Sequence, residues 1–172
     1  PNRELTQDWL AKGPMIDSLD HLVTVRSIKL NCDGALGNRG AWLLEEYSDM
    51  AGQFGLETLP MEYVLEISKA GLAQGFQVCA HAIGDRANRE VFDQYEAAML
   101  DFPEVKDHRF RIEHAQHLHP DDLPRFAELN VIAAMQAVHM SSDRPWAIDR
   151  LGQKRIVEGA YMWQTILKSG AK

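Results

Sequence analysis

Residues 77–99 read QVCAHAIGDRANREVFDQYEAAM, and this stretch contains the pattern that decides the fold. Residues 77–81 form a short, mainly apolar run that predicts a strand. From Asp85 to Met99, apolar side chains recur at helical spacing and predict an amphipathic helix. A short strand followed at once by a helix of this length is typical of a βα unit.

The same alternation extends in both directions along the chain. Pro60 and Gly75 bracket a helical pattern at 61–74, as is common at helix ends. The other predicted strands are 22–31, 109–113 and 131–137, and the other predicted helices are 120–129 and 155–169. An amphipathic segment opens the chain, and residues 37–55 form a polar linker. The pattern indicates an α/β fold with a parallel sheet, in one domain over 1–172. Four strands are fewer than most complete α/β barrels contain, so we expect part of a larger fold.

Composition limits the classes of partner. The 172 residues are 45% hydrophobic, which is enough to bury an ordinary core. The chain carries 25 acidic and 18 basic side chains, and its net charge of −7 opposes non-specific attraction to nucleic acid or to an anionic membrane. A small molecule is therefore the expected partner.

Compartment is predicted from the cysteines and from the start of the chain. Cys32 and Cys79 are far apart in the sequence and predict neither a disulfide framework nor a cysteine zinc site. No apolar run approaches the roughly 20 residues that span a bilayer, and Pro1 to Glu4 does not resemble a signal peptide. We expect a soluble, cytoplasmic chain with reduced cysteines.

Two histidines follow predicted strands at the edge where parallel α/β folds build their sites. His81 ends the strand at 77–81, and His114 follows the strand at 109–113. A histidine in such a place can be a satisfied core residue. Two on neighbouring strands can also converge as imidazole ligands of a divalent metal.

Lys29 lies among apolar residues in the first predicted strand. Its stem can pack while its amine reaches the surface. Alternatively, a buried and deprotonated amine can react with carbon dioxide to form a carbamate that bridges metal ions.

Three ordered motifs then identify a family. Residues 29–37 read KLNCDGALG, residues 80–87 read AHAIGDRA and residues 111–116 read RIEHAQ. Together with the pairs at 135–136 and 142–143 and with residues 160–163, they closely resemble the third family of the amidohydrolase superfamily, which includes N-substituted formamide deformylase. The resemblance runs from about residue 28 to residue 172.

The resemblance implies a (β/α)8 TIM barrel of which this chain supplies strands four to seven. By position, Lys29 matches a bridging fourth-strand lysine, and His81 and His114 match metal-binding histidines of the fifth and sixth strands. It further implies one or two divalent ions, with zinc as the leading identity, and metal-activated hydrolysis of an amide-like C–N bond.

Some parts of the family site are missing from the sequence. His21 stands alone near the start, so the first-strand His-x-His pair is absent, and no aspartate stands where the eighth strand would supply a proton shuttle. His117-Leu118-His119 matches the pair as written but follows the wrong strand. We therefore expect the chain alone to be inactive.

A non-catalytic half-barrel, with an interaction or structural role, remains the alternative function. The uncovered edges of a partial barrel sheet also predict that the chain self-associates or is only marginally stable.

Other polar and aromatic residues are candidates for substrate contact, helix starts or packing. Gln136 and His139, after the fourth strand, are candidates for substrate contact. Asp85 can start a helix or orient a ligand, with the helix start favoured. Strand alternation predicts that Glu113 faces the surrounding helices. Asp143 is expected at a helix start, and three aromatic residues are expected to pack: Trp146, Tyr161 and Trp163.

Overall fold

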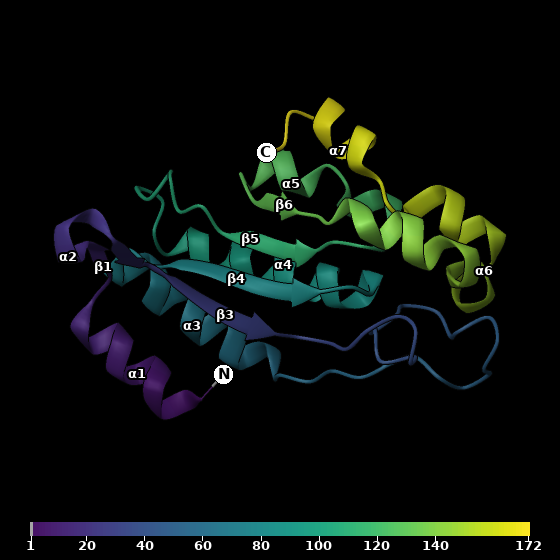
Figure 1. The fold of residues 1–172 in the computed structure, drawn as a ribbon, viewed down its shortest axis with the longest axis horizontal. Coiled ribbons are helices and arrows are strands. Elements are labelled where there is room, and N and C mark those ends of the chain that lie inside the picture. The colour runs from purple at the N-terminus through teal and green to yellow at the C-terminus, as the bar shows by residue number, and fades with distance from the viewer. Residues whose placement is uncertain (1) are drawn as a thin grey trace.

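A parallel four-stranded sheet forms the centre of the computed structural model, which describes residues 2–172. Its strands are β3 (Ser27–Asn31), β4 (Gln77–Ala82), β5 (Arg111–His114) and β6 (Ile132–Ala134), and they lie side by side in that order (Figure 1). Each strand therefore pairs with the next in the sequence. The predicted α/β fold with a parallel sheet is confirmed.

Two helices cover one face of this sheet. They are α3 (Met61–Gln74) and α4 (Asp85–Leu100), which lie behind the strands in Figure 1. The bounds of α3 are those predicted. Pro60 is its N-cap residue, and Gly75 ends it with φ 78°, a left-handed conformation that glycine adopts without a Cβ penalty.

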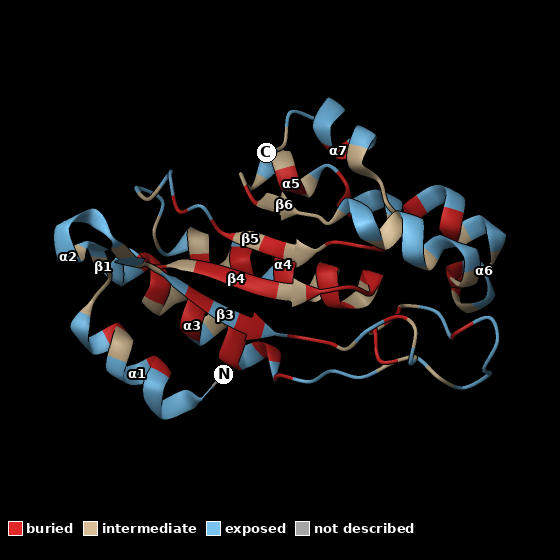
Figure 2. Ribbon diagram, viewed as in Figure 1, coloured by how far each residue is buried: buried red, intermediate tan, exposed pale blue. Residues whose placement is uncertain are grey.

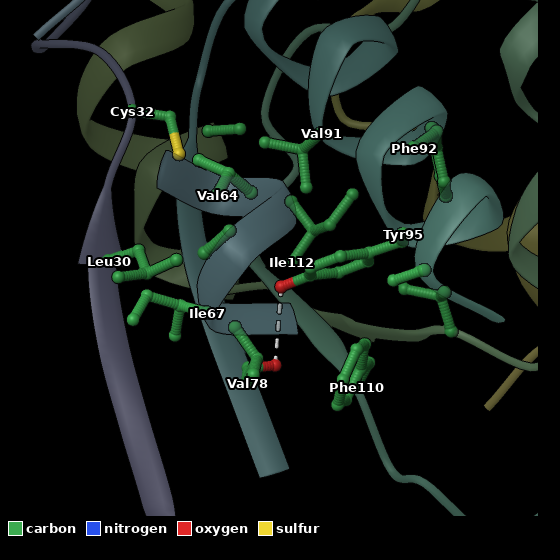
Figure 3. Close-up of a cluster of buried hydrophobic side chains, with 14 of the residues drawn as sticks. Leu30, Cys32, Val64, Ile67, Val78, Val91, Phe92, Tyr95, Phe110 and Ile112 are labelled. Carbon is green, nitrogen blue, oxygen red and sulfur yellow. Dashed lines mark hydrogen bonds between the residues drawn. The ribbon is translucent and has the colours of Figure 1, made fainter. Parts of the chain in front are cut away.

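The main hydrophobic core lies between the sheet and these helices (Figures 2 and 3). Leu30, Val78 and Ile112 contribute from consecutive strands and are fully buried. The phenol of Tyr95 on α4 donates to the carbonyl of Val78 across 3.2 Å, which satisfies a hydroxyl that is otherwise surrounded by apolar groups.

The opposite face of the sheet carries polar side chains. Lys29 pairs in register with Cys79, Asn31 with His81, and His81 with Glu113, so these residues share one face. The prediction that Glu113 faces the helices is wrong. Its neighbour Ile112 takes that place, and Glu113 accepts a 2.6 Å hydrogen bond from Arg111 on the polar face.

The N-terminal strand prediction is also wrong in part. Residues 22–31 do not form one strand, because the chain pairs as a separate hairpin, β1 (Met15–Asp17) with β2 (Val23–Val25), before β3 begins. Helix α1 (Arg3–Lys12) precedes this hairpin, and α2 (Ser18–His21) connects its strands.

The C-terminal helices differ most from expectation. The predicted helix at 155–169 is replaced by α6 (Ala137–Gly159), kinked at Gly152, and by the separate α7 (Trp163–Lys168). The helix expected at 120–129 is divided into a 3-10 turn, Pro120–Asp122, and α5 (Arg125–Glu128), with Pro124 before α5.

A second apolar cluster joins the linker to α6 beyond the carboxyl ends of the strands (Figure 1). Leu43 and Tyr47 of the linker pack there with Ala147 and Leu151 of α6. This cluster places both segments at the edge of the sheet where His81 and His114 lie. None of the helices in residues 2–172 is both long and apolar enough to cross a membrane. Cys32 and Cys79 are free and buried.

Candidate metal centre

His81 and His114 meet at the carboxyl edge of the sheet. Their rings contact edge to face, with centroids 4.5 Å apart. His139, in the first turn of α6, places its ring centroid 5.3 Å from that of His114. The structure therefore brings together residues that the sequence singled out for two different roles, metal binding and substrate contact.

The backbone turns sharply where β5 ends. His114 has φ 78° and the next residue, Ala115, has φ 43°, a left-handed region that residues with a Cβ adopt at a cost of about 1–2 kcal/mol. Strict alternation would place His114 on the helix face beside Ile112. The turn instead allows its ring to reach His81, which lies on the polar face.

Asp33 fixes the surroundings of His81. It is buried, and its carboxylate accepts backbone N–H groups of Ile83 at 3.0 Å, Gly84 at 2.8 Å and Trp42 at 3.0 Å. Its Oδ1 atom lies 3.2 Å from Nε2 of His81, at hydrogen-bond distance but without the alignment of a good hydrogen bond.

Asp33 is not among the site residues predicted from the sequence, where it appears only within the motif at residues 29–37. Its position, just after the strand that carries Lys29, is the signal that could have identified it, because His81 and His114 also lie at the carboxyl ends of their strands.

Gln136 contacts His114 directly. Nδ1 of His114 donates to Oε1 of Gln136 across 2.7 Å, and Nε2 of Gln136 donates to the carbonyl of Ala134 across 2.8 Å. Desolvation lowers the pKa of His114, against the effect of the hydrogen bond to Gln136, and the neutral imidazole is the form that binds a metal.

Lys29 extends its amine along β3 towards the same edge. Its Nζ donates to Oδ1 of Asn31 at 3.1 Å and to the carbonyl of Leu30 at 3.2 Å. Lys29 remains exposed by surface area, yet desolvation lowers its pKa, and this effect outweighs the attraction of Glu113. A lowered pKa favours the neutral amine that carbamate formation requires.

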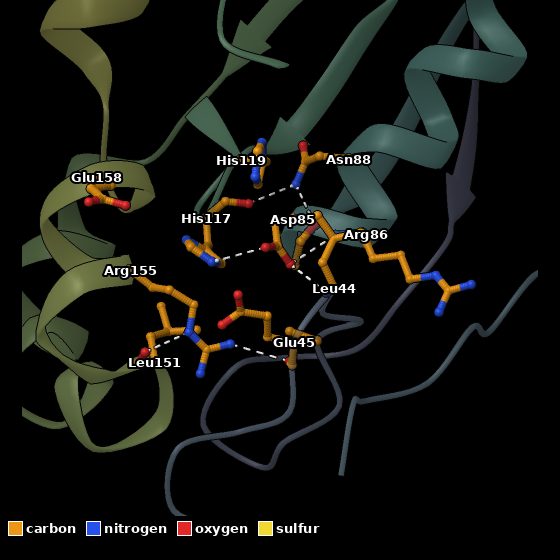
Figure 4. Close-up of polar contacts among 12 residues, drawn as sticks. Leu44, Glu45, Asp85, Arg86, Asn88, His117, His119, Leu151, Arg155 and Glu158 are labelled. Atoms are coloured by element: carbon orange, nitrogen blue, oxygen red, sulfur yellow. Dashed lines mark hydrogen bonds and ion pairs between the residues drawn. The ribbon is translucent and has the colours of Figure 1, made fainter. Parts of the chain in front are cut away.

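His117 and His119 lie at a different place. With Asp85 and Glu158 they line a cavity of about 330 Å³ between the start of α4 and the end of α6 (Figure 4). Neither Lys29, His81 nor His114 lines it.

Asp85 holds this second place together. It is the first residue of α4, after the N-cap residue Gly84, so the helix-start interpretation is confirmed. Its Oδ1 accepts N–H groups of Leu44 at 2.9 Å and Arg86 at 3.0 Å, and Oδ2 lies 3.4 Å from Nε2 of His117. Burial acts to raise the pKa of Asp85, but these donors outweigh it and lower the pKa.

Asp143 is not at a helix start. It lies inside α6, where Oδ2 accepts a 3.3 Å hydrogen bond from the buried amide of Gln116, which also donates to the phenol of Tyr161 at 3.2 Å. Trp146 and Tyr161 pack against the second apolar cluster, as expected.

The donors at the sheet edge form an incomplete ligand set. Within residues 2–172, no group of three or more His, Cys, Asp or Glu side chains is arranged to hold a metal ion. The residues that could hold one are the pair His81 and His114, each with a second ring nitrogen beside a fixed polar partner, together with Lys29 as a carbamate.

The fold and this edge define an α/β protein with candidate metal ligands at the carboxyl ends of its parallel strands. Comparison with known proteins identifies the family. The amidohydrolase family model matches residues 3–172, and the chain therefore belongs to the amidohydrolase family. Protein LONG AFTER FAR-RED 3 of Arabidopsis thaliana is 36% identical over 94% of this chain. The putative amidohydrolase YtcJ of Bacillus subtilis strain 168 is 33% identical over 84% of it.

Two solved structures are also similar. An uncharacterized metal-dependent hydrolase from Pyrococcus furiosus superposes on 96% of the chain with a TM-score of 0.82 and 30% identity. One from Pyrococcus horikoshii OT3 does so with a TM-score of 0.81 and 29% identity. The chain spans about a quarter of each curated relative, 27% and 26%, and about a third of each solved chain, 33% and 32%.

Proposed function

We propose that this chain supplies half of a divalent metal centre, in a hydrolase that cleaves C–N bonds of formamide-like or other small amide substrates. The observation that carries the proposal is the contact between His81 and His114, two imidazoles on adjacent strands, each beside a fixed polar partner. The name of the Pyrococcus relatives, metal-dependent hydrolase, supports it.

In this proposal the sheet is four consecutive strands of a (β/α)8 barrel. The order β3-β4-β5-β6 is sequential and parallel, as barrel strands are, and the site lies at their carboxyl ends. Barrel closure would cover the polar face that carries Lys29, His81 and Glu113.

His81, His114 and a carbamate of Lys29 would hold the metal, with zinc as the leading identity. When bound, a divalent ion lowers the pKa of water and polarises a carbonyl. Among the chain's own residues, Gln136 holds the ring of His114, and Asn31, which pairs in register with His81, holds the Lys29 amine. The ring of His139 lies beside that of His114, where it could reach a bound substrate. The leaving nitrogen needs a proton donor, and a carboxylate from another part of the barrel would suit this role.

The test uses the longest natural polypeptide that contains this chain, loaded with Zn²⁺ and supplied with N-formyl and N-acetyl alkylamines. We expect amine release that is lost in His81→Asn and His114→Asn variants but kept in His21→Asn, a control at an exposed histidine far along the chain from the site. Equal activity in all four proteins would contradict the proposal. If the loaded wild-type protein hydrolyses no amide, the non-catalytic alternative is favoured.

A further inference from the structure

We infer that the cavity beside His117 is a binding site for a small organic ammonium ion, such as a protonated alkylamine. The inference rests on contacts within this chain and is independent of the proposed metal centre.

The cavity has the size and the lining of a small-molecule site. Its volume of about 330 Å³ lies within the range of about 300–1,000 Å³ that is usual for ligand pockets. Leu44, Leu118 and Pro120 give it apolar walls, and His117 with a few charged side chains completes the lining. An apolar pocket with a few polar groups is the usual form of such a site.

His117 supplies the observation that points to a ligand. Only 2% of this residue is exposed, yet neither ring nitrogen makes a hydrogen bond to any group in residues 2–172. Nε2 lies 3.4 Å from Oδ2 of Asp85, close enough for an ion pair but without the alignment of a hydrogen bond. Buried polar groups in native proteins are almost always hydrogen-bonded, so an imidazole of this kind in a cavity wall marks a place where a ligand can bind.

The surrounding backbone holds this ring at the cavity wall. The N–H of His117 donates to the carbonyl of Ile83 at 3.0 Å, and its carbonyl accepts from the side-chain amide of Asn88 at 3.3 Å. On the other side, a Cβ on Gly159 would lie 3.1 Å from Nδ1, so the missing side chain there gives the ring its room. Because the ring is held from both sides, a hydrogen-bonding partner has to reach it through the cavity.

The charges around the ring favour a cation. The carboxylates of Glu45 and Glu158 lie on two sides of His117, and that of Asp85 lies on a third (Figure 4). Glu45 gives its backbone carbonyl to Arg155 and leaves its carboxylate facing the cavity. Negative charge therefore surrounds the one buried imidazole.

The basic side chains of the same cavity are engaged elsewhere. Arg89 donates to Asp122 at 2.9 Å, and Arg155 donates to the carbonyl of Leu151 at 2.6 Å. The side chain of Lys154 is 80% exposed and lies mainly in water. The groups best placed to bind a ligand are therefore acceptors, which favour a ligand with N–H donors.

An organic ammonium ion fits these acceptors better than a metal ion. Within residues 2–172, no three His, Cys, Asp or Glu side chains are arranged to hold a metal ion, so the acceptors around His117 are too far apart for one. A protonated primary amine carries three N–H donors. In this cavity it would donate to His117 and to the carboxylates of Glu45 and Glu158, and its hydrocarbon chain would pack against the apolar walls.

The test titrates the metal-free, ¹⁵N-labelled chain with n-butylammonium chloride and follows the histidine ring nitrogens by NMR, at a mildly alkaline pH where the amine is still protonated. We expect saturable shifts at His117, with a dissociation constant in the millimolar range. His108 is the internal control, because it is also buried but both its ring nitrogens have partners, and it should not shift. The inference is overturned if His117 shows no saturable shift, or if n-butanol or butyrate binds as tightly as n-butylammonium.

Two variants test the charges without disturbing the core. Glu45→Gln and Glu158→Gln change exposed side chains, so both proteins should fold. Each should weaken n-butylammonium binding by about 2–5-fold, as the loss of an exposed ion pair does. Glu104→Gln is the matched control, since it removes the same charge from an exposed glutamate away from the cavity and should change nothing. Equal weakening in all three variants, or in none, would overturn the inference.

A second pair of variants separates this site from the proposed metal centre. His81→Asn and His114→Asn should bind n-butylammonium as tightly as the wild-type chain, because neither residue lines the cavity. Loss of amine binding in these variants would place the amine at the sheet edge and overturn the inference. If amine binding is present but Zn²⁺ binding that depends on His81 and His114 is not, the proposed metal centre fails while the ammonium site stands.

Discussion

The imidazole rings of His81 and His114 lie edge to face with centroids 4.5 Å apart, although helix α4 separates their strands in the sequence. The parallel pairing of β4 with β5 brings the two strand ends together, and the left-handed backbone at His114 completes the contact. A backbone conformation of this kind at a residue with a Cβ is a strain that often accompanies function.

Strain at His114 predicts a stability difference between two variants that both lose the imidazole. His114→Gly should be more stable than His114→Ala by about 1 kcal/mol, because glycine adopts φ 78° without the Cβ penalty. Urea unfolding followed by circular dichroism measures the difference. An alanine variant as stable as the glycine variant would show that the turn is not strained.

Gly159 is predicted to tolerate no side chain. A Cβ there would overlap the carbonyl of Leu118 and lie 3.0 Å from Cε1 of His117. Gly159→Ala should therefore destabilise the chain by about 3 kcal/mol in thermal unfolding. Gly52→Ala is the control, since its Cβ would meet nothing within 4 Å and only its φ of 75° costs about 1 kcal/mol. Equal losses in the two variants would contradict the predicted overlap.

His108 predicts a pH dependence away from the metal centre. Nε2 of His108 donates to the carbonyl of Leu129 at 3.1 Å, and Nδ1 accepts from the N–H of Phe110 at 3.0 Å. Desolvation lowers the pKa of His108 below its ordinary value of 6.5, against the effects of the Leu129 carbonyl and Asp107. As the pH falls, His108 therefore becomes protonated in the unfolded chain before it does so in the folded chain. Its contribution to the free energy of unfolding is fully present above pH 6.5 and is lost progressively as the pH falls below that value.

The measurement compares the wild-type chain with His108→Gln by urea unfolding at about pH 8 and about pH 5. We expect the stability advantage of the wild-type chain to shrink by about 1 kcal/mol at the lower pH, where protonation removes the acceptor for Phe110. An advantage that is the same at both pH values would contradict this assignment.

The strands and helices that follow local signals were predictable from the sequence. Helix α3 has its predicted bounds because Pro60 and Gly75 mark both ends, and its apolar positions follow a helical period. Helix α6 was missed because Pro145 and the polar residues before it are typical of a helix start, whereas the structure places them inside the helix. Packing of Ala147 and Leu151 against the linker favours helix there, and local propensity does not report such contacts.

In the candidate site, too, local sequence signals were predictable and contacts between distant segments were not. His81 and His114 could be chosen because each ends or follows an apolar strand, and Lys29 because it lies among apolar residues within one, but the residues that each of them contacts could not be predicted. Asp33 meets Ile83 and Gly84 only after the linker folds back on β4, a contact between distant segments. The error at Glu113 came from assuming regular alternation through His114, where the positive φ turns the chain.

Zinc binding by the chain, measured by equilibrium dialysis, tests the proposed metal centre most directly. The proteins to compare are the wild-type chain, His81→Ala, His114→Ala and the control His119→Ala, whose ring lines the separate cavity beside Asp85. We predict weak or partial occupancy in the wild-type chain, since the ligand set is incomplete, and a further fall in His81→Ala and His114→Ala but not in His119→Ala. Tight, stoichiometric zinc that neither His81→Ala nor His114→Ala reduces would contradict the assignment.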